Sequence, residues 1–402
     1  MNSVVRQMWE QNTDVVMVDT GNSYEGLCEY VGGKYISYTD EHPITMNPFA
    51  IKREELNIEK IGFLKNLIML IWKGTQGEVT KTEDRLIEQV IKEYFEEYFV
   101  KKQIENLSFN TFYEYSTVRI PQIIKENNLA GIDLAAYNYL LKDFYKGGSH
   151  ELTLNENLDT KLFDETFIVF EIDSIKDDPL LFPLVTLIIM DVFIQKMRIK
   201  KNRKVLVIEE AWKAIASPMM AEYIKYLYKT ARKFWASVGV VTQEIQDIVG
   251  SPIVKEAIIN NSDIVMLLDQ SKFRERFNEI KAILGLTDVD CKKIFTINRL
   301  ENKEGRSFFR EVFIRRGSVG GVFGVEEPHE CYMTYTTERA EKEALKLYKK
   351  ELQCDHQHAI EAYCRDRELS GITKSLPFAQ KVNQAGHVLR LKPKQEKGLN
   401  RL

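Results

Sequence analysis

The sequence predicts an α/β protein with a mostly parallel sheet, an inserted all-α domain and a C-terminal helical tail. Three observations predict this class. Short apolar runs of strand length alternate with helical stretches, as in parallel sheets covered on both faces. Strand-like runs are absent from about residue 50 to residue 157. A polar helical pattern and a basic segment close the chain.

Composition excludes several classes of protein. The chain has 402 residues, with 56 Lys and Arg against 59 Asp and Glu, which gives a net charge of −3. Hydrophobic residues make up 44%, enough for a large core, so the chain is not wholly disordered, collagen-like or highly basic. Five cysteines in so long a chain do not form a disulfide framework, and they favour a reducing compartment. No secretory signal is visible at the start.

The first fifty residues predict a helix, a strand, a short helix and another strand. Asn2 to Trp9 is the first helical piece, and Asp14 to Val18 is a β-branched run typical of a buried parallel strand. The strand ends in a turn that begins at Asp19. Tyr24 to Tyr30 predicts the second helix and Lys34 to Tyr38 the second strand.

From about Phe49 to Asn157, apolar residues recur at helical spacing. Ile61 to Trp72 is apolar on most sides, while Leu86 to Phe99 and Leu134 to Tyr145 each show an apolar face. This segment predicts a helical domain inserted into the α/β chain.

The α/β pattern then resumes. Four further strand candidates are predicted for the parallel sheet: Thr166 to Glu171, Lys204 to Glu209, Ser237 to Thr242 and Asp263 to Leu268. Leu180 to Ile194 is the most apolar stretch, but it is shorter than a membrane span and contains Pro183 and Asp191, so it predicts a buried helix.

The rest of the chain is less apolar. Shorter β-like pieces cover Ser307 to Arg315 and Val319 to Val325. One polar helix is predicted at about Glu338 to Tyr363, and the last thirty residues are basic with little periodicity.

Ligands of open α/β sheets bind at the carboxyl ends of the strands, so polar residues there are candidates for chemistry. The apolar run Val205 to Ile208 is followed directly by Glu209 and Glu210. As neighbours on a strand, these two side chains would point to opposite sides. One acid could hold Mg²⁺ through water, and the other could deprotonate an attacking water. Two solvated glutamates that cap the next helix are the alternative.

Three other positions are candidates. Gln243 closes a buried strand and could sense a terminal phosphate, or serve as an ordinary turn residue. Asp19 could contact a ligand or form an Asx-type turn. Arg232 and Lys233 near a helix end could complete a neighbouring subunit's phosphate site, or contact solvent and the helix dipole.

Two clusters have less specific patterns. Cys354, His356, His358 and Cys364 lie within eleven residues, but they lack the paired C-x-x-C spacing that zinc sites use. The basic stretch Arg198 to Lys204 and the tail Lys381 to Arg401 could contact nucleic acid or anionic lipid. A solvated connection and a disordered tail are the plainer interpretations.

The 402 residues contain no phosphate loop of the form G-x-x-x-x-G-K-[ST]. The nearest string, Gly26 to Lys34, has Cys28 where the first glycine belongs, and Tyr35 replaces the Ser or Thr.

The order of these motifs resembles that of one family. The chain presents DTGNSYEGLCEYVGGKYI, the helical insertion, VLVIEEAW, TARKF, VVTQEIQDI and DIVMLL in turn. Over about residues 1 to 335 it is similar to the motor ATPases of conjugation and type IV secretion, in the HerA/FtsK branch of the P-loop superfamily, and above all to the TraG-type ATPases of conjugative transposons. The double acid followed by Ala-Trp is the most specific piece.

The resemblance implies a RecA-like P-loop NTPase core that uses ATP and Mg²⁺. Glu209 and Glu210 match the Walker B pair, although the family more often has Asp at the first position. Glu210 matches the catalytic glutamate and Gln243 the phosphate-sensing glutamine. Arg232, with Lys233, matches the arginine finger supplied to the next subunit of a homo-hexamer.

The resemblance also implies boundaries and a context. The expected parts are residues 1–49 and 158–335 as the ATPase core, 50–157 as the inserted domain and 336–402 as the tail. In the family the Walker A motif precedes the first helix, so we expect a chain truncated just after that motif and inactive alone. The expected location is the bacterial cytoplasm, peripheral at the inner membrane through other secretion proteins. A DNA translocase and a non-enzymatic scaffold remain the alternatives.

Overall fold

The computed structural model describes residues 1–157, 159–210, 218–242, 258–299 and 309–389. The chain divides into two compact units. The larger unit contains residues 7–21 and 34–262, and the smaller unit contains residues 1–6, 22–33 and 263–402. The predicted domain boundaries stay predictions, because groups of contacts do not have to coincide with domains.

The larger unit is built on a five-stranded sheet, sheet A, in which every neighbouring pair is parallel. The strand order is β2-β3-β1-β4-β5. The strands are β1 (Thr13–Asp19), β2 (Lys34–Ser37), β3 (Phe167–Glu171), β4 (Arg203–Glu209) and β5 (Ala236–Val241). Strands β1 and β3 are buried along their whole length, which explains why their sequences are continuous apolar runs without alternation.

Helices fill the rest of the larger unit. Two of them follow strands of sheet A, α8 (Leu181–Ile199) and α10 (Pro218–Ala231). The helices of the inserted segment are α3 (Ile58–Lys73), α4 (Lys81–Phe95), α5 (Phe109–Glu126), α6 (Leu134–Leu141) and α7 (Glu151–Asn155), with a π-helical turn at Glu96–Lys102. Short 3₁₀ turns are η1 (Arg53–Glu55), η3 (Lys142–Phe144), η4 (Thr160–Asp164), η5 (Asp173–Ile175), η6 (Arg232–Phe234) and η7 (Ile259–Asn261). The predicted helical character of this segment is confirmed.

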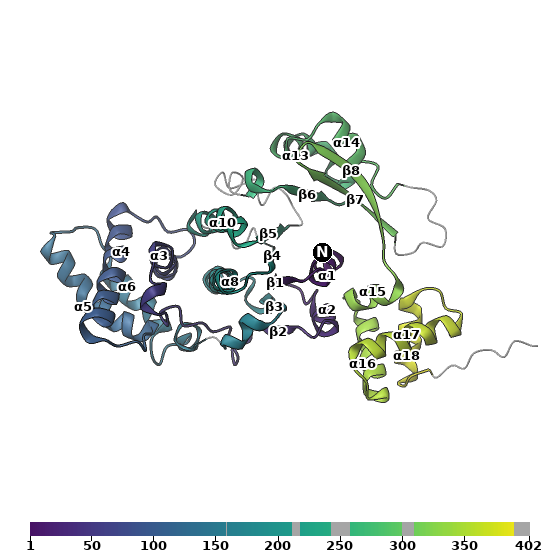
Figure 1. Ribbon diagram of the computed structural model, residues 1–402, viewed down its shortest axis with the longest axis horizontal. Coiled ribbons are helices and arrows are strands. Elements are labelled where there is room, and N and C mark those ends of the chain that lie inside the picture. The colour runs from purple at the N-terminus through teal and green to yellow at the C-terminus, as the bar shows by residue number, and fades with distance from the viewer. Residues whose placement is uncertain (158, 211–217, 243–257, 300–308, 390–402) are drawn as a thin grey trace, which may run out of the picture. The chain divides into compact units, whose positions relative to one another are not determined.

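One apolar core runs from sheet A into the inserted helices. Helix α8, buried along nearly all of its length, lies between the strands and α3 (Figure 1). The Lys60 ammonium of α3 lies 2.8 Å from the Asp191 carboxylate of α8, and both side chains are buried. The predicted buried helix at Leu180 to Ile194 is therefore confirmed. In the described residues, no helix has the length and apolarity that a membrane crossing needs.

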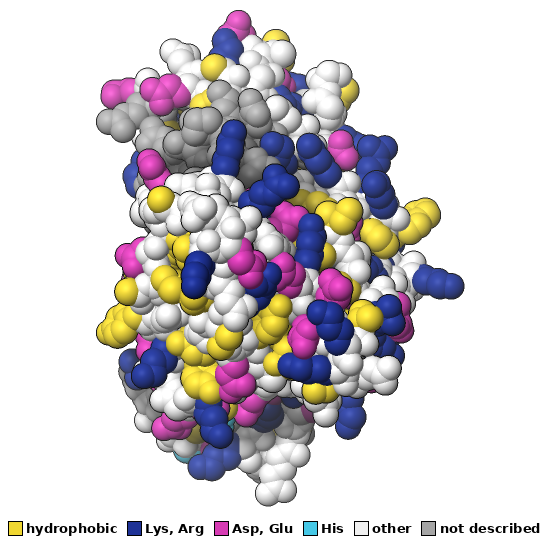
Figure 2. Space-filling model, turned by 90° about the vertical axis from the view of Figure 1, so that its left-hand side faces the viewer, with side chains coloured by type: hydrophobic (Ala, Val, Ile, Leu, Met, Phe, Trp, Pro, Cys, Tyr) yellow, Lys and Arg dark blue, Asp and Glu magenta, His cyan; other side chains and the backbone are white. Residues whose placement is uncertain are grey.

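The inserted helices pack around aromatic rings. Phe49 lies at the centre, stacked on Phe112 with ring centroids 4.8 Å apart and edge-on to Tyr94 at 5.9 Å. The side of the molecule that carries α4, α5 and α6 is shown in Figure 2, where Lys and Arg alternate with Asp and Glu around hydrophobic patches. This side therefore presents no field of a single charge sign.

The smaller unit contains a second sheet, sheet B, of order β6-β7-β8. Its strands are β6 (Ile264–Leu267), β7 (Phe309–Arg316) and β8 (Val319–Glu326). Its helices are α1 (Asn2–Glu10, which the division into units cuts after Arg6), α2 (Glu25–Tyr30), α13 (Phe277–Leu284), α14 (Asp288–Ile294), α15 (His329–Tyr335), α16 (Arg339–Leu352), α17 (His356–Ser370) and α18 (Ser375–Ala385), with a 3₁₀ turn η8 (Ser271–Arg276).

Two expectations for this part of the chain are wrong. The strand predicted at Asp263 to Leu268 does not join the parallel sheet; it pairs antiparallel with β7. The single polar helix is two helices, because Gln353 takes a left-handed conformation (φ 51°) and the Asp355 side chain caps α17 by accepting from the His358 N–H. The expected helical tail agrees with α18, whose buried residues include Phe378, Ala379 and Val382.

Candidate functional site at the carboxyl edge of sheet A

Acidic residues end three adjacent strands of sheet A at the same edge. Because all five strands are parallel, their carboxyl ends meet there. Asp19, the last residue of β1, lies opposite Glu171, the last residue of β3. On the other side of β1, Val18 pairs with Ile208 of β4, so Glu209 follows in the same register. The edge therefore gathers three carboxylates on neighbouring strands.

Two of these three acids, Asp19 and Glu171, are buried. Asp19 has no exposed surface and Glu171 is 3% exposed. Glu171 accepts from the Tyr35 hydroxyl at 3.2 Å and from the Asp173 backbone N–H at 2.8 Å. The Asp19 carbonyl accepts from the Ile172 N–H at 2.9 Å, which ties the ends of β1 and β3 together. These bonds fix the edge on which the more exposed acids lie.

Glu171 was missed by the sequence reasoning. Its signal was present, because the run that predicts β3 ends in an acid exactly as the run that predicts β4 does. The sequence alone did not show that β3 and β4 flank the same strand, and only the strand order places Glu171 beside Asp19.

The two adjacent acids of the sequence motif differ in backbone conformation. Glu209 is the last residue of β4 and is half-buried. Glu210 lies outside the strand, in the left-handed region with φ 48°. The expectation that both lie on the strand and point to opposite sides is therefore wrong. A left-handed glutamate costs about 1 kcal/mol, and such strain is typical of residues held in place for function.

The remaining predicted residues lie elsewhere. Gln243 falls outside the described residues; Thr242, just before it, follows β5 at the carboxyl edge and is half-buried. Arg232 and Lys233 form η6, directly before β5, and both are exposed. They therefore lie at the amino edge of sheet A, so the sheet separates them from Glu209 of the same chain.

The acids at the carboxyl edge fit Mg²⁺ as nucleotide sites hold it. Mg²⁺ there takes one or two carboxylates and completes its shell with phosphate oxygens and waters. In the part of the chain that the structure describes, no three acidic, histidine or cysteine side chains could hold a metal ion together. Glu209, half-buried at the end of β4, suits a site in which one carboxylate binds Mg²⁺ and phosphate oxygens and waters complete the shell.

The cysteine and histidine cluster is spread over α17 and its cap. The His358 ring lies 2.7 Å from the Asp355 carboxylate, and the His356 Nδ1 lies 3.3 Å from Glu29. Cys364 is buried in α17, and burial raises the pKa of its thiol to about 12, so it is not a ready metal ligand.

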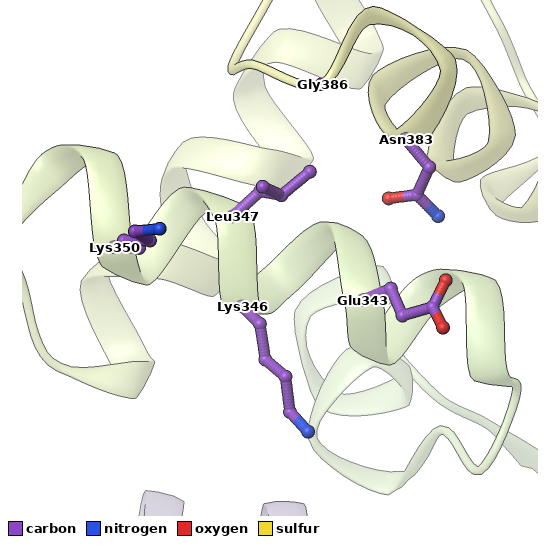
Figure 3. A pocket seen from close by; sticks show the side chains of 6 residues that line it. All are labelled: Glu343, Lys346, Leu347, Lys350, Asn383 and Gly386. Carbon is purple, nitrogen blue, oxygen red and sulfur yellow. The ribbon is translucent and has the colours of Figure 1, made fainter.

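A shallow depression lies in the smaller unit, between α16 and α18 (Figure 3). Its lining residues are Glu343, Lys346, Leu347, Lys350, Asn383 and Gly386. Glu343 pairs with Arg339 at 2.8 Å, and the Asn383 amide donates to the Ala340 carbonyl at 2.8 Å. None of the predicted site residues lines it.

The sequence matches the TraG P-loop domain over residues 1–367. The chain belongs to the TraG P-loop domain family. Protein TraC of Escherichia coli (strain K12) is 22% identical over 287 residues, which are 69% of this chain and 31% of TraC. The chain thus spans about a third of the length of that relative.

Solved structures share the RecA-like P-loop NTPase fold of this TraG P-loop domain. VirB4 of Thermoanaerobacter pseudethanolicus superposes with a TM-score of 0.58 at 19% identity, covering 82% of this chain and 86% of VirB4. The bacterial conjugative coupling protein TrwB, in complex with sulphate, gives 0.52 at 14% identity, covering 81% and 80%. TrwB in complex with ADP and Mg²⁺ gives 0.50 at 12% identity, with the same coverage. At these identities the likeness is one of fold.

Proposed function

We propose that this TraG P-loop domain binds and hydrolyses ATP with Mg²⁺ and thereby energises conjugative transfer through a type IV secretion system. The observation that supports this most is the row of acids at the carboxyl edge of sheet A, in a chain of this family. Proteins of the same fold include VirB4 and the plasmid coupling protein TrwB, which was solved in complex with ADP and Mg²⁺.

Each residue that the sequence predicts for this edge has a proposed task. Glu209 would hold Mg²⁺ through water, and Mg²⁺ would neutralise charge on the phosphate oxygens. Glu210 would orient and deprotonate the attacking water from its turn beyond the strand. Asp19 would support the nucleotide from the end of β1, and Gln243 would sense the terminal phosphate.

Arg232 and Lys233 would act on another subunit. They lie at the amino edge of sheet A, away from Glu209 of their own chain, so they fit a finger that acts in trans. This role requires head-to-tail contacts between copies, and we propose a homo-hexameric ring. Other secretion proteins would hold the ring at the cytoplasmic face of the inner membrane.

The decisive experiment measures ATP turnover by a polypeptide that carries both this domain and a phosphate loop. Glu210→Gln keeps the size of the side chain but removes the base, so we expect kcat to fall by about 10² to 10⁴ with ATP affinity nearly unchanged. Glu105→Gln, an exposed glutamate of the inserted segment, is the matched control and should keep full turnover. Unchanged turnover in Glu210→Gln would refute the assignment.

A DNA translocase is the second candidate, suggested by the basic tail Lys381 to Arg401 of the sequence. Stimulation of the ATPase that increases with DNA length would support it. Absence of DNA binding at low salt would exclude it.

A further inference from the structure

The amino edge of sheet A carries a second exposed surface, which the proposed ATP site does not use. Its members are Ile199, Lys201, Arg203 and Trp235, which we call the amino-edge surface. The first three lie at the end of α8 and the start of β4, and Trp235 lies directly before β5. Because β4 and β5 are neighbours, the two segments lie side by side.

A buried ammonium group holds these two segments together. The Lys204 side chain, 1% exposed, donates to the carbonyls of Lys200 at 2.9 Å, Asn202 at 2.5 Å and Phe234 at 3.2 Å. The Lys204 N–H also donates to the Trp235 carbonyl at 3.0 Å. Lys204 therefore ties the end of α8 and the start of β4 to the segment that leads into β5.

The exposed cations lack acidic partners within the larger unit. Two basic neighbours are already paired, Arg198 with Glu59 and Lys200 with Asp164. Lys201 and Arg203 are exposed and make no ion pair with any residue that the structure describes. This positive region stands out in a chain whose net charge is −3.

Two large apolar side chains project among these cations. Trp235 is 70% exposed and Ile199 is 58% exposed. Trp235 occupies a left-handed turn with φ 55°, so its position is fixed by the backbone between η6 and β5.

We propose that the amino-edge surface binds directly to a bilayer that contains anionic lipid. A Trp beside an aliphatic side chain suits the boundary between headgroups and acyl chains, and Lys and Arg around them attract anionic headgroups. Single-stranded nucleic acid fits less well, because such sites stack successive bases on several rings along a basic groove, whereas this surface offers one ring. The chain would then contact lipid itself, instead of only through other proteins.

Vesicle sedimentation tests this with the 402-residue chain and needs no nucleotide, so it is independent of the proposed ATPase. We expect binding to vesicles of 70% phosphatidylcholine and 30% phosphatidylglycerol, and little binding to pure phosphatidylcholine. The double variant Lys201→Gln, Arg203→Gln should bind about 25-fold more weakly, at about fivefold for each cation. Lys125→Gln with Lys142→Gln, two exposed lysines of the inserted segment, is the matched control and should bind as the parent does.

A second readout reports on the indole itself. Brominated lipid should quench part of the tryptophan fluorescence of the parent, and Trp235→Phe should abolish this quenching. Tyr139→Ala, which removes another exposed ring, is the control and should leave the quenching unchanged. Three results would overturn the proposal: equal binding to neutral and anionic vesicles, unchanged binding of the double variant, or binding to a thymidine 20-mer by these same residues without binding to vesicles.

Discussion

At the scale of single residues, buried charged groups are stabilised by specific partners. Lys196 has no exposed surface, yet its ammonium lies 3.0 Å from the Asp14 carboxylate and donates to two backbone carbonyls, those of Phe163 and Glu165. Burial lowers the pKa of Lys196 although Asp14 opposes the shift. Removing Asp14 would leave the buried charge of Lys196 uncompensated. We therefore assign Lys196 a role in stabilising the fold and not in the proposed hydrolysis of ATP.

His329 gives the smaller unit a dependence on pH. Its ring stacks on Tyr332 and Tyr363, with centroids 6.2 and 6.4 Å apart. Burial, with a contribution from Arg367, lowers the pKa of His329 to about 4. In the unfolded chain its pKa is about 6.5, so between pH 6.5 and pH 4 the unfolded state binds more protons. Stability should therefore fall as pH falls through this range, by less than the full shift would give because solvent screens a ring that is only partly buried.

Calorimetry at pH 7, 5.5 and 4.5 tests this prediction. His329→Phe keeps a ring but cannot be protonated, so its loss of stability between pH 7 and pH 4.5 should be smaller than that of the parent. His358→Gln is the control: His358 is exposed and Asp355 raises its pKa, so this substitution cannot flatten the acid-side slope. An equal slope in His329→Phe and the parent would contradict the prediction.

At the scale of elements, helix α4 shows how a local sequence signal fixes a helix start. The Thr80 Oγ1 accepts from the Glu83 N–H at 3.2 Å, and the Glu83 carboxylate accepts from the Thr80 N–H at 3.0 Å. The Lys73 ammonium lies 2.5 Å from the same carboxylate. Burial would raise the pKa of Glu83, but the hydrogen bonds from Lys73 and Thr80 outweigh it and hold the pKa below its usual value. This capping box joins the end of α3 to the start of α4.

Thr80→Ala should destabilise the larger unit by about 1 kcal/mol, because the N3 backbone N–H loses its acceptor. Thr80→Ser should restore most of the stability. Thr117→Ala, inside α5, is the control and should be neutral or slightly stabilising, since alanine favours a helix interior. Urea unfolding measures the three free energies, and a loss in Thr80→Ala no larger than in Thr117→Ala would show that the cap does not contribute.

At the scale of the whole molecule, the larger unit behaves as one body. Its apolar core is continuous from sheet A through α8 to the aromatic rings around Phe49. The inserted helices therefore depend on the sheet for part of their burial, and the Lys60–Asp191 ion pair between α3 and α8 adds to this coupling.

The 402-residue chain should hydrolyse ATP no faster than background on its own. In the proposed site its acids would hold Mg²⁺ and orient water, but its sequence contains no G-x-x-x-x-G-K-[ST] loop whose amides and lysine would cradle the phosphates. Phosphate release at saturating ATP and Mg²⁺ measures this. Robust hydrolysis by this chain that Glu210→Gln abolishes would contradict the need for the loop.

Much of the architecture followed from sequence patterns. Continuous apolar runs predicted β1, β3 and β4, because a strand buried on both faces has no polar side. The same kind of run predicted β5, although its residues are only half-buried or exposed. Helical spacing predicted the inserted helices, and the lack of a run of about 20 apolar residues predicted that α8 is a buried helix. The apolar run of β6 wrongly predicted a further strand of the parallel sheet. Its residues form a partly exposed antiparallel strand, with Ile264 51% and Met266 43% exposed.

The sequence by itself determined that Asp19 and Glu209 end their strands, because each closes an apolar run that is visible in a one-dimensional pattern. Only the tertiary structure decided which of these ends are neighbours, because strand order depends on packing between segments far apart in the chain. That order placed the missed Glu171 beside Asp19. The parallel direction of β5 put Arg232 and Lys233 at the opposite edge, and a left-handed backbone placed Glu210 beyond the end of β4. In the sequence Lys204 is one of several basic residues. In the folded chain its hydrogen bonds to the carbonyls of Phe234 and Trp235 hold Trp235 among exposed cations.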